Sequence, residues 1–337
     1  MPQPTPLAYG KVPQELLARL LRDRTAAPEE VVGPGVGLDA AVLEVGDVGG
    51  FLVAASDPIT FTAGEIGWYA VHVNANDVAC MGARPAWFVA TLLLPRGTVE
   101  DEIAEILRQI DEACAGIGAA LVGGHTEITS GIDRPLVAGT MLGLTERWLS
   151  AGEAEPGDAL LLTKGVAVEG TAILARDLAE RLEGRIEPEV LERARGFLRD
   201  PGLSVVPDAA VALRAGRVHA LHDPTEGGVA TGIRELCEAS GTGARIEVDA
   251  IPVFEETRAI AEALDLDPLG LIASGALLVA TAEGDAERIA EALEEEGIPA
   301  ARIGTVSEGG EGITAVGTSG KTAPLKRFEA DELTRVL

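Results

Sequence analysis

Two segments in the first quarter of the chain decide its fold: SDPIT at residues 56–60 and VNANDVACMGARP at residues 73–85. Asp57 follows an apolar run and precedes a proline, which disfavours helical backbone, so we expect it at the end of a strand. Residues 65–80 carry apolar side chains at roughly helical spacing, and Gly82 and Pro85 are stop signals. The segments therefore predict a strand that ends in a carboxylate, followed by an amphipathic helix.

The predicted helix carries Asn76 and Asp77 in its last turns. The carbonyl end of a helix disfavours a negative charge unless a cation neutralises it. A cation site that holds magnesium-bound phosphate is one interpretation of Asp57, Asn76 and Asp77. A solvated helix end is the alternative, and this stretch alone leaves both open.

The length of the chain favours two domains. Its 337 residues exceed the size that one core usually serves, and a hydrophobic fraction of 47% is ample for two cores. Helical patterns alternate with short β-like runs, which predicts an α/β or α+β protein. The pattern breaks at EAEPGD, residues 153–158, so we predict one domain over residues 1–152 and a second over residues 153–337.

The charge of the chain limits its partners. A formal net charge of −27 argues against nucleic acid and acidic membranes as partners. Adaptation to high salt and simple compositional bias both remain open as its origin. No uncharged stretch is long enough to span a membrane, and the first residues lack a basic and then apolar leader, so we predict a cytoplasmic protein.

The three cysteines, Cys80, Cys114 and Cys237, show no paired spacing. Neither a disulfide framework nor a zinc site is indicated. We predict that all three are buried thiols.

A paired glycine forms the next candidate site. Gly123 and Gly124 follow an apolar run, and we predict a turn there whose N–H groups, with Thr126, bind phosphate. A tight turn between strands at residues 119–122 and 136–144 is the alternative. His125 is interpreted as a hydrogen-bonding residue or as a metal ligand.

Lys164 lies between a predicted strand at residues 159–163 and the start of a helix. This position suits binding of a nucleotide phosphate, although the spacing is not that of a P-loop. A solvated lysine is the alternative.

Further carboxylates follow strands or glycine turns. Asp223 ends an apolar run and opens the segment DPTEGG before a helix, and Asp39 follows a glycine loop at residues 32–37, which comes after a helix predicted at residues 12–24. Together with Asp57 and Asp77, these side chains are expected where hard cations bridge protein oxygens to phosphates.

Four motifs in this order resemble one known family: GLDAA at residues 37–41, NDVACMGA at 76–83, GGHT at 123–126 and HDPTEGG at 222–228. On these motifs the chain is similar to the ATP-binding proteins related to aminoimidazole ribonucleotide synthetase, the PurM-like superfamily. Within it, the chain most resembles the hydrogenase maturation proteins of the HypE type and their archaeal relatives.

The resemblance implies a two-domain fold. The N-terminal domains would pair across a homodimer into a β-barrel, the C-terminal domain would be an α/β sandwich, and ATP and Mg²⁺ would bind in a cleft beside the dimer interface. Carried over by position, the magnesium ligands would be Asp39, Asp57, Asp77 and Asp223, and the nucleotide contacts would be Asn76, Gly123, Gly124 and Thr126.

The chain departs from the HypE pattern at three places. Leu38 and His125 stand where the family carries acidic residues, and no cysteine follows Cys237, whereas HypE carries one at its C-terminus. We expect an ATP- and Mg²⁺-dependent enzyme that acts on a small amide or phosphorylated substrate, with a maturation protein as a partner. A non-catalytic nucleotide-binding paralogue, and a small-molecule kinase or synthetase, are the alternatives. The sequence names no catalytic residue.

Overall fold

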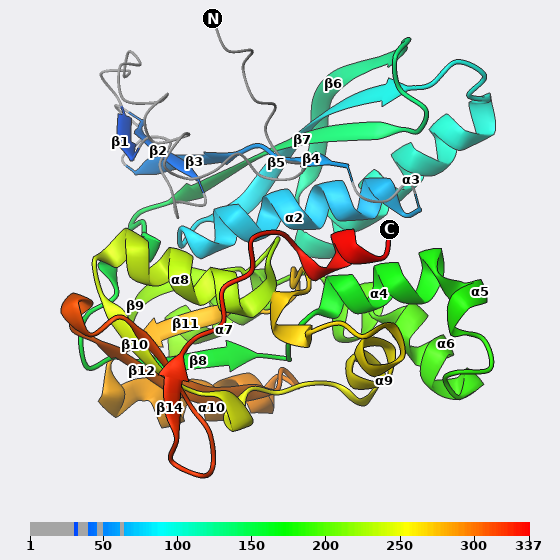
Figure 1. Cartoon of the computed structure of the whole chain (residues 1–337). Coiled ribbons are helices and arrows are strands. Elements are labelled where there is room, and N and C mark those ends of the chain that lie inside the picture. The colour runs from blue at the N-terminus through cyan, green and yellow to red at the C-terminus, as the bar shows by residue number, and fades with distance from the viewer. Residues whose placement is uncertain (1–29, 33–39, 46–49, 61–63) are drawn as a thin grey trace, which may run out of the picture.

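The computed structural model of the chain describes residues 30–32, 40–45, 50–60 and 64–337. These residues form two mixed β-sheets with helices packed on them (Figure 1), which confirms the α/β prediction. The helix predicted at residues 12–24, the glycine loop after residue 32 and Asp39 lie outside the described residues.

The first sheet has the strand order β1-β2-β3-β7-β5-β6, and β4 also pairs with β7. Its strands are antiparallel except for the parallel pair β5 and β6. Over the described residues this sheet is open, with β6 at one edge. Its elements are β1 (Glu30–Val32), β2 (Ala41–Glu44), β3 (Phe51–Ala55), β4 (Pro58–Ile59), α2 (Ile66–Cys80), β5 (Arg84–Leu94), α3 (Glu100–Ile117), β6 (Ala120–Ile128) and β7 (Leu136–Thr145).

The second sheet has the order β14-β13-β10-β12-β8-β11-β9. The domain boundary between residues 152 and 153 stays a prediction. The part of the chain that carries the first sheet is called the first half, and the part that carries the second sheet the second half. The elements of the second half are β8 (Ala159–Thr163), α4 (Val168–Asp177), α5 (Ala179–Leu182), α6 (Pro188–Gly196), α7 (Val206–Ala215), β9 (Val218–His222), α8 (Gly228–Ser240), β10 (Gly243–Glu247), α9 (Glu255–Leu264), β11 (Leu278–Thr281), α10 (Ala286–Glu295), β12 (Ala300–Ser307), β13 (Ile313–Val316) and β14 (Thr322–Pro324).

Helix α2 lies between the two halves (Figure 1). Of its 15 residues, 13 are buried, including Asn76 and Asp77. The prediction of a helix over residues 65–80 is confirmed, but the prediction that it is amphipathic is wrong, and so is the alternative that its end is solvated. An amphipathic helix needs one face in contact with water. Here the second half of the chain covers the face of α2 that the first half leaves open, so no polar face is required.

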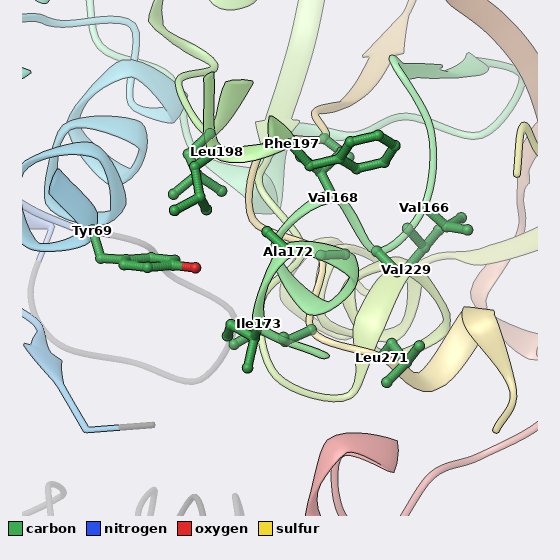
Figure 2. Packing of buried hydrophobic residues seen from close by; sticks show 14 of the residues in the cluster. Tyr69, Val166, Val168, Ala172, Ile173, Phe197, Leu198, Val229 and Leu271 are labelled. Atoms are coloured by element: carbon green, nitrogen blue, oxygen red, sulfur yellow. The ribbon is translucent and has the colours of Figure 1, made fainter. Parts of the chain in front are cut away.

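The hydrophobic core continues from one half into the other. Tyr69 of α2 points toward Leu198 and Ile173 of the second half (Figure 2), and all three belong to one cluster of buried side chains. A second cluster joins Cys80, at the end of α2, to Leu161 and Leu221. Burial of apolar surface therefore holds the two halves together as well as each sheet.

The paired glycines lie inside a strand. Gly123 and Gly124 were predicted to form a turn, and this prediction is wrong, because β6 runs without a break from Ala120 to Ile128. The register to β5 shifts by one residue just before Gly123, which indicates a β-bulge. A Cβ on Gly124 would lie 1.9 Å from the carbonyl oxygen of Ala90, so the close approach of the two strands explains the glycine.

The three cysteines are buried and free, as predicted. No helix in the part of the chain that the structure describes is long and apolar enough to cross a membrane.

Helices α2 and α3 touch at Gly67, and this contact generates a prediction. A Cβ on Gly67 would lie 2.4 Å from the carbonyl oxygen of Ile106, so Gly67→Ala should force the helices apart. We expect a loss of about 1 to 3 kcal/mol in the free energy of unfolding, measured by chemical denaturation.

Gly116→Ala is the matched control, because Gly116 lies in α3 and its added Cβ would meet nothing within 4 Å. It should raise stability by up to about 1 kcal/mol through helix propensity. Equal stability of the two variants would contradict the assigned contact.

Candidate functional site

Three of the predicted magnesium ligands, Asp57, Asp77 and Asp223, lie on α2 or are held against it by hydrogen bonds. Asn74 and Asp77 are three residues apart, as are Asp77 and Cys80, so each of these pairs lies on neighbouring turns of the helix. Asn74 binds the main chain of Asp57: the Asp57 N–H donates to Asn74 Oδ1 at 2.8 Å, and Asn74 Nδ2 donates to the Asp57 carbonyl at 3.1 Å. The end of β3 is thereby held against the helix, one turn from Asp77.

Asp223 reaches α2 from the second half. It follows β9 directly, is buried, and accepts a hydrogen bond from Cys80 Sγ at 3.5 Å. From Asn74 to Cys80 the helix rises about 9 Å. We call Asp57, Asp77 and Asp223 the acidic stripe. Asp39, the fourth predicted ligand, lies outside the described residues.

The predicted nucleotide contacts on β6 share a row of the first sheet with Asp57. The Gly139 N–H donates to the Asp57 carbonyl at 3.0 Å, Gly139 pairs with Ala90, and Ala90 pairs with Gly124. Three strand spacings correspond to about 14 Å. Gly123, Gly124 and Thr126 are exposed on this edge strand, so the structure places them level with Asp57 but not in contact with it.

Asn76 joins the two halves. Its Nδ2 donates to the Leu203 carbonyl at 2.9 Å, and its Oδ1 accepts from the Val205 N–H at 2.8 Å. The side chain is fully buried. We assign this amide to the contact between α2 and the loop before α7, because both of its polar groups are engaged there.

Lys164 is buried, so the alternative of a solvated lysine is wrong. Its Nζ donates to the Ser204 carbonyl at 2.7 Å, to the Gly275 carbonyl at 3.0 Å and to Asp208 Oδ2 at 3.1 Å. An ammonium group has three donors, and these acceptors take all of them. Burial lowers the pKa of Lys164, and the neighbouring Asp208 opposes that shift. The geometry favours a structural role over phosphate binding.

Two buried carboxyl groups with raised pKa values were missed in the sequence. Burial raises the pKa of Glu169, at the start of α4, to about 7, and that of Asp331, near the C-terminus, to about 6. Asp331 accepts hydrogen bonds from the N–H groups of Gly227 and Leu333. Glu169 lies five residues after Lys164, in the helix predicted to start there, whereas no motif marks Asp331.

A carboxyl group whose pKa lies near neutrality can take up or release a proton at working pH. Glu169 also acts on Tyr69 of α2, whose pKa is raised well above its ordinary value by burial and by this carboxylate. The first turn of α4 therefore brings a proton-exchanging group toward α2.

His125 forms a hydrogen bond, as one of its two interpretations predicted. Its Nε2 lies 3.2 Å from Glu127 Oε2 on the exposed face of β6. Within the described ranges no group of three or more His, Cys, Asp or Glu side chains has the geometry of a metal centre. Mg²⁺ commonly takes one or two carboxylates and completes its shell with phosphates and water, so the acidic stripe fits such an ion.

Comparison with known proteins places the chain in one family. Residues 37–145 match the N-terminal domain, and residues 155–317 the C-terminal domain, of the family described as AIR synthase related protein. The carbamoyl dehydratase HypE of Azotobacter vinelandii is 33% identical over 310 residues, which cover 89% of this chain and 85% of that protein.

Two solved structures share the fold. The crystal structure of the hydrogenase maturation protein HypE in complex with ATP matches with a TM-score of 0.71 and 26% identity, covering 94% of this chain and 91% of that one. HypE from a HypE–HypF complex matches with a TM-score of 0.73 and 23% identity, covering 87% and 94%. The second likeness shows the fold alone.

The pKa of Glu169 generates a prediction on stability. Between its ordinary pKa of 4.5 and about 7, the folded chain keeps a proton that the unfolded chain has released. Stability from this group is therefore fully present below pH 4.5 and is lost as the pH rises through about 7. Relative to Glu169→Gln, the free energy of unfolding of the wild type should fall by about 2 to 3 kcal/mol between pH 5 and pH 8.

Urea denaturation across that pH range measures this difference. Glu291→Gln, on the exposed face of α10, is the matched control for the loss of one carboxylate. If the wild type and Glu169→Gln follow parallel curves of stability against pH, the assignment of this proton to Glu169 is wrong.

Proposed function

The chain belongs to the AIR synthase related family, and we propose that it is an ATP- and Mg²⁺-dependent enzyme of the HypE type that activates a small amide or phosphorylated substrate. The acidic stripe carries this proposal. It joins carboxylates from two distant parts of the sequence along consecutive turns of α2, which is the oxygen-rich surrounding that magnesium-bound phosphate requires. The HypE relatives and the ATP complex of a similar chain support it.

In the proposed reaction, one or two carboxylates from the set of Asp57, Asp77, Asp223 and Asp39 would hold the metal, and phosphates and water would complete its shell. When bound, Mg²⁺ offsets the negative charge that develops on the transferred phosphoryl group. Asp77 and Asp223 are buried, which strengthens their interaction with a cation, because little water screens it. Glu169 would exchange a proton at neutral pH on the α4 side of α2.

The cysteines bear on the substrate. Cys80, Cys114 and Cys237 are all buried, so none offers an accessible thiol as an acceptor. A carbamoyl group carried on a thiol would therefore not be carried on these three cysteines, and we propose a hydrogenase maturation protein as the source of that thiol. The likeness to the hydrogenase maturation protein HypE solved in complex with ATP, at 26% identity, supports this maturation context.

The same observation favours a second candidate function. A chain that binds nucleotide and docks on a maturation protein without turnover needs no thiol of its own. ATP turnover separates the two functions, and the products separate a dehydratase from a kinase or synthetase of the same family, since a kinase leaves a phosphorylated substrate.

We further propose a homodimer formed through the first sheet. Large apolar side chains are exposed on its strands, among them Val122 at 56%, Ile128 at 51% and Leu144 at 48%. Strand β6 also leaves one edge of the described sheet unpaired. An exposed apolar edge strand tends to pair with another chain, and two open sheets that pair in this way can close a barrel.

Asp77→Asn tests the metal site. We expect it to lower the affinity for a non-hydrolysable ATP analogue in the presence of Mg²⁺ by at least about tenfold, because the stripe loses a charge, and to leave the metal-free affinity unchanged. Isothermal calorimetry with and without Mg²⁺ measures both values.

Asp111→Asn, on the exposed face of α3, is the control and should bind as the wild type does. An unchanged affinity of Asp77→Asn would remove that residue from the site. If the wild type binds no nucleotide at millimolar concentration, both the enzyme and the binding-module proposals fail.

Val122→Lys tests the dimer. A lysine on the edge strand should prevent its pairing, so sedimentation velocity should show a dimer for the wild type and a monomer for the variant. Leu213→Lys, which alters an exposed leucine of α7, should stay dimeric. A monomeric wild type, or a dimeric Val122→Lys, would rule out this interface.

A further inference from the structure

The buried amide of Asn74 forms hydrogen bonds with the main chain of Asp57, which is an exposed residue. The side chain is fully buried in α2, and three hydrogen bonds engage it. Asn74 Oδ1 accepts from the Asp57 N–H at 2.8 Å, and Nδ2 donates to the carbonyls of Asp57 at 3.1 Å and Ala70 at 2.8 Å. Both backbone polar groups of Asp57 are therefore fixed by one helical side chain.

The strand on the other side completes this arrangement. The Gly139 N–H donates to the Asp57 carbonyl at 3.0 Å, and Ser56 Oγ donates to the Gly139 carbonyl at 2.7 Å. A Cβ on Gly139 would lie 2.5 Å from Asn74 Nδ2, so only glycine leaves room for the amide. We call Asn74, Gly139 and Ser56 the Asp57 clamp.

The clamp holds the peptide of Asp57 and leaves its carboxylate outside. Asp57 is exposed, and none of the described residues donates a hydrogen bond to its carboxylate. Pro58 further restricts the backbone of Asp57 to extended conformations. A buried amide is costly unless it is hydrogen-bonded, and an apolar side chain would fill the same space without that cost, so the clamp serves the orientation of Asp57 rather than the core.

The clamp also sets the position of Asp57 relative to Asp77. Asn74 and Asp77 are one turn apart on the same helix face, so the distance between the two carboxylates depends on a rigid element instead of a loop. We propose that Asn74 is a positioning residue that presents the Asp57 carboxylate to magnesium-bound phosphate. This inference rests on the proposed function and names a residue that acts through Asp57.

The experiment compares Mg²⁺ affinities at a fixed concentration of a non-hydrolysable ATP analogue. Asn74→Ala should lower the Mg²⁺ affinity by about tenfold or more, as removal of a partner that orients a metal ligand does, and should leave the metal-free affinity for the analogue unchanged. In the Asp57→Asn background, Asn74→Ala should cause no further loss, because the carboxylate that it orients is already gone.

Gln109→Ala is the matched control for loosening of α2. Gln109 Oε1 accepts from the Gly67 N–H at 3.0 Å, so this variant also removes a buried amide bonded to a main-chain group, away from Asp57. It should lower the melting temperature without changing the Mg²⁺ affinity. Ser56→Ala, at an exposed position, carries the test if Asn74→Ala does not fold, and should lower the Mg²⁺ affinity severalfold only when Asp57 is present.

Three results would overturn the inference: an unchanged Mg²⁺ affinity in the clamp variants, an equal loss in Gln109→Ala, or additive losses in the Asn74→Ala/Asp57→Asn double variant. Failure of the proposed function looks different, since the wild type itself would then show no Mg²⁺-dependent nucleotide binding. That result would remove the inference as well.

Discussion

The burial of α2 on every side is the constraint on which the rest of the structure depends. A helix that lies between two packed halves gives its polar side chains little access to water, and Asn74, Asn76 and Cys80 each form a hydrogen bond inside the protein. The partners come from distant parts of the chain, and each contact fixes one of those parts. Asn74 holds the end of β3, Asn76 holds the loop before α7, and Cys80 contacts Asp223 after β9.

These contacts explain how two sheets build one site. The loop at residues 198–205 is attached to α2 by Trp68 Nε1, which donates to the Leu198 carbonyl, and by Arg199, which stacks on the Trp68 ring and pairs with Glu65. Lys164 holds the same loop from the second sheet through Ser204. The second half is therefore fixed against the helix that carries Asp77, and Asp223 arrives beside it as a result.

Local chemistry predicted the elements well and their surroundings less well. Asp57 lies two residues after β3 ends, because Pro58 disfavours helical backbone at this position, and residues 66–80 form the predicted helix, which ends before Gly82. The paired glycines suggested a turn, yet a bulge and a close approach to Ala90 use them inside β6. Lys164 suggested an anion site, yet Asp208 and two carbonyls enclose it. Glycines occur in turns and in bulges, and lysines bind anions or form buried structural contacts. The local sequence does not distinguish these roles, which depend on the residues that surround each one in the fold.

By itself, the sequence determined the mixed α/β class, the strand just before Asp57, the buried thiols and the resemblance that pointed to ATP and Mg²⁺. All of these follow from local propensity or from motifs read along the chain. Only the tertiary structure decided that Asp57, Asp77 and Asp223 lie along consecutive turns of α2, that Asn76 and Lys164 join the two halves, and that the pKa of Glu169 is raised to about 7. The reason is that burial and pairing depend on residues that are distant in the sequence, such as Asn76 and Leu203 or Cys80 and Asp223, whose meeting is fixed by packing around α2 and not by any local pattern.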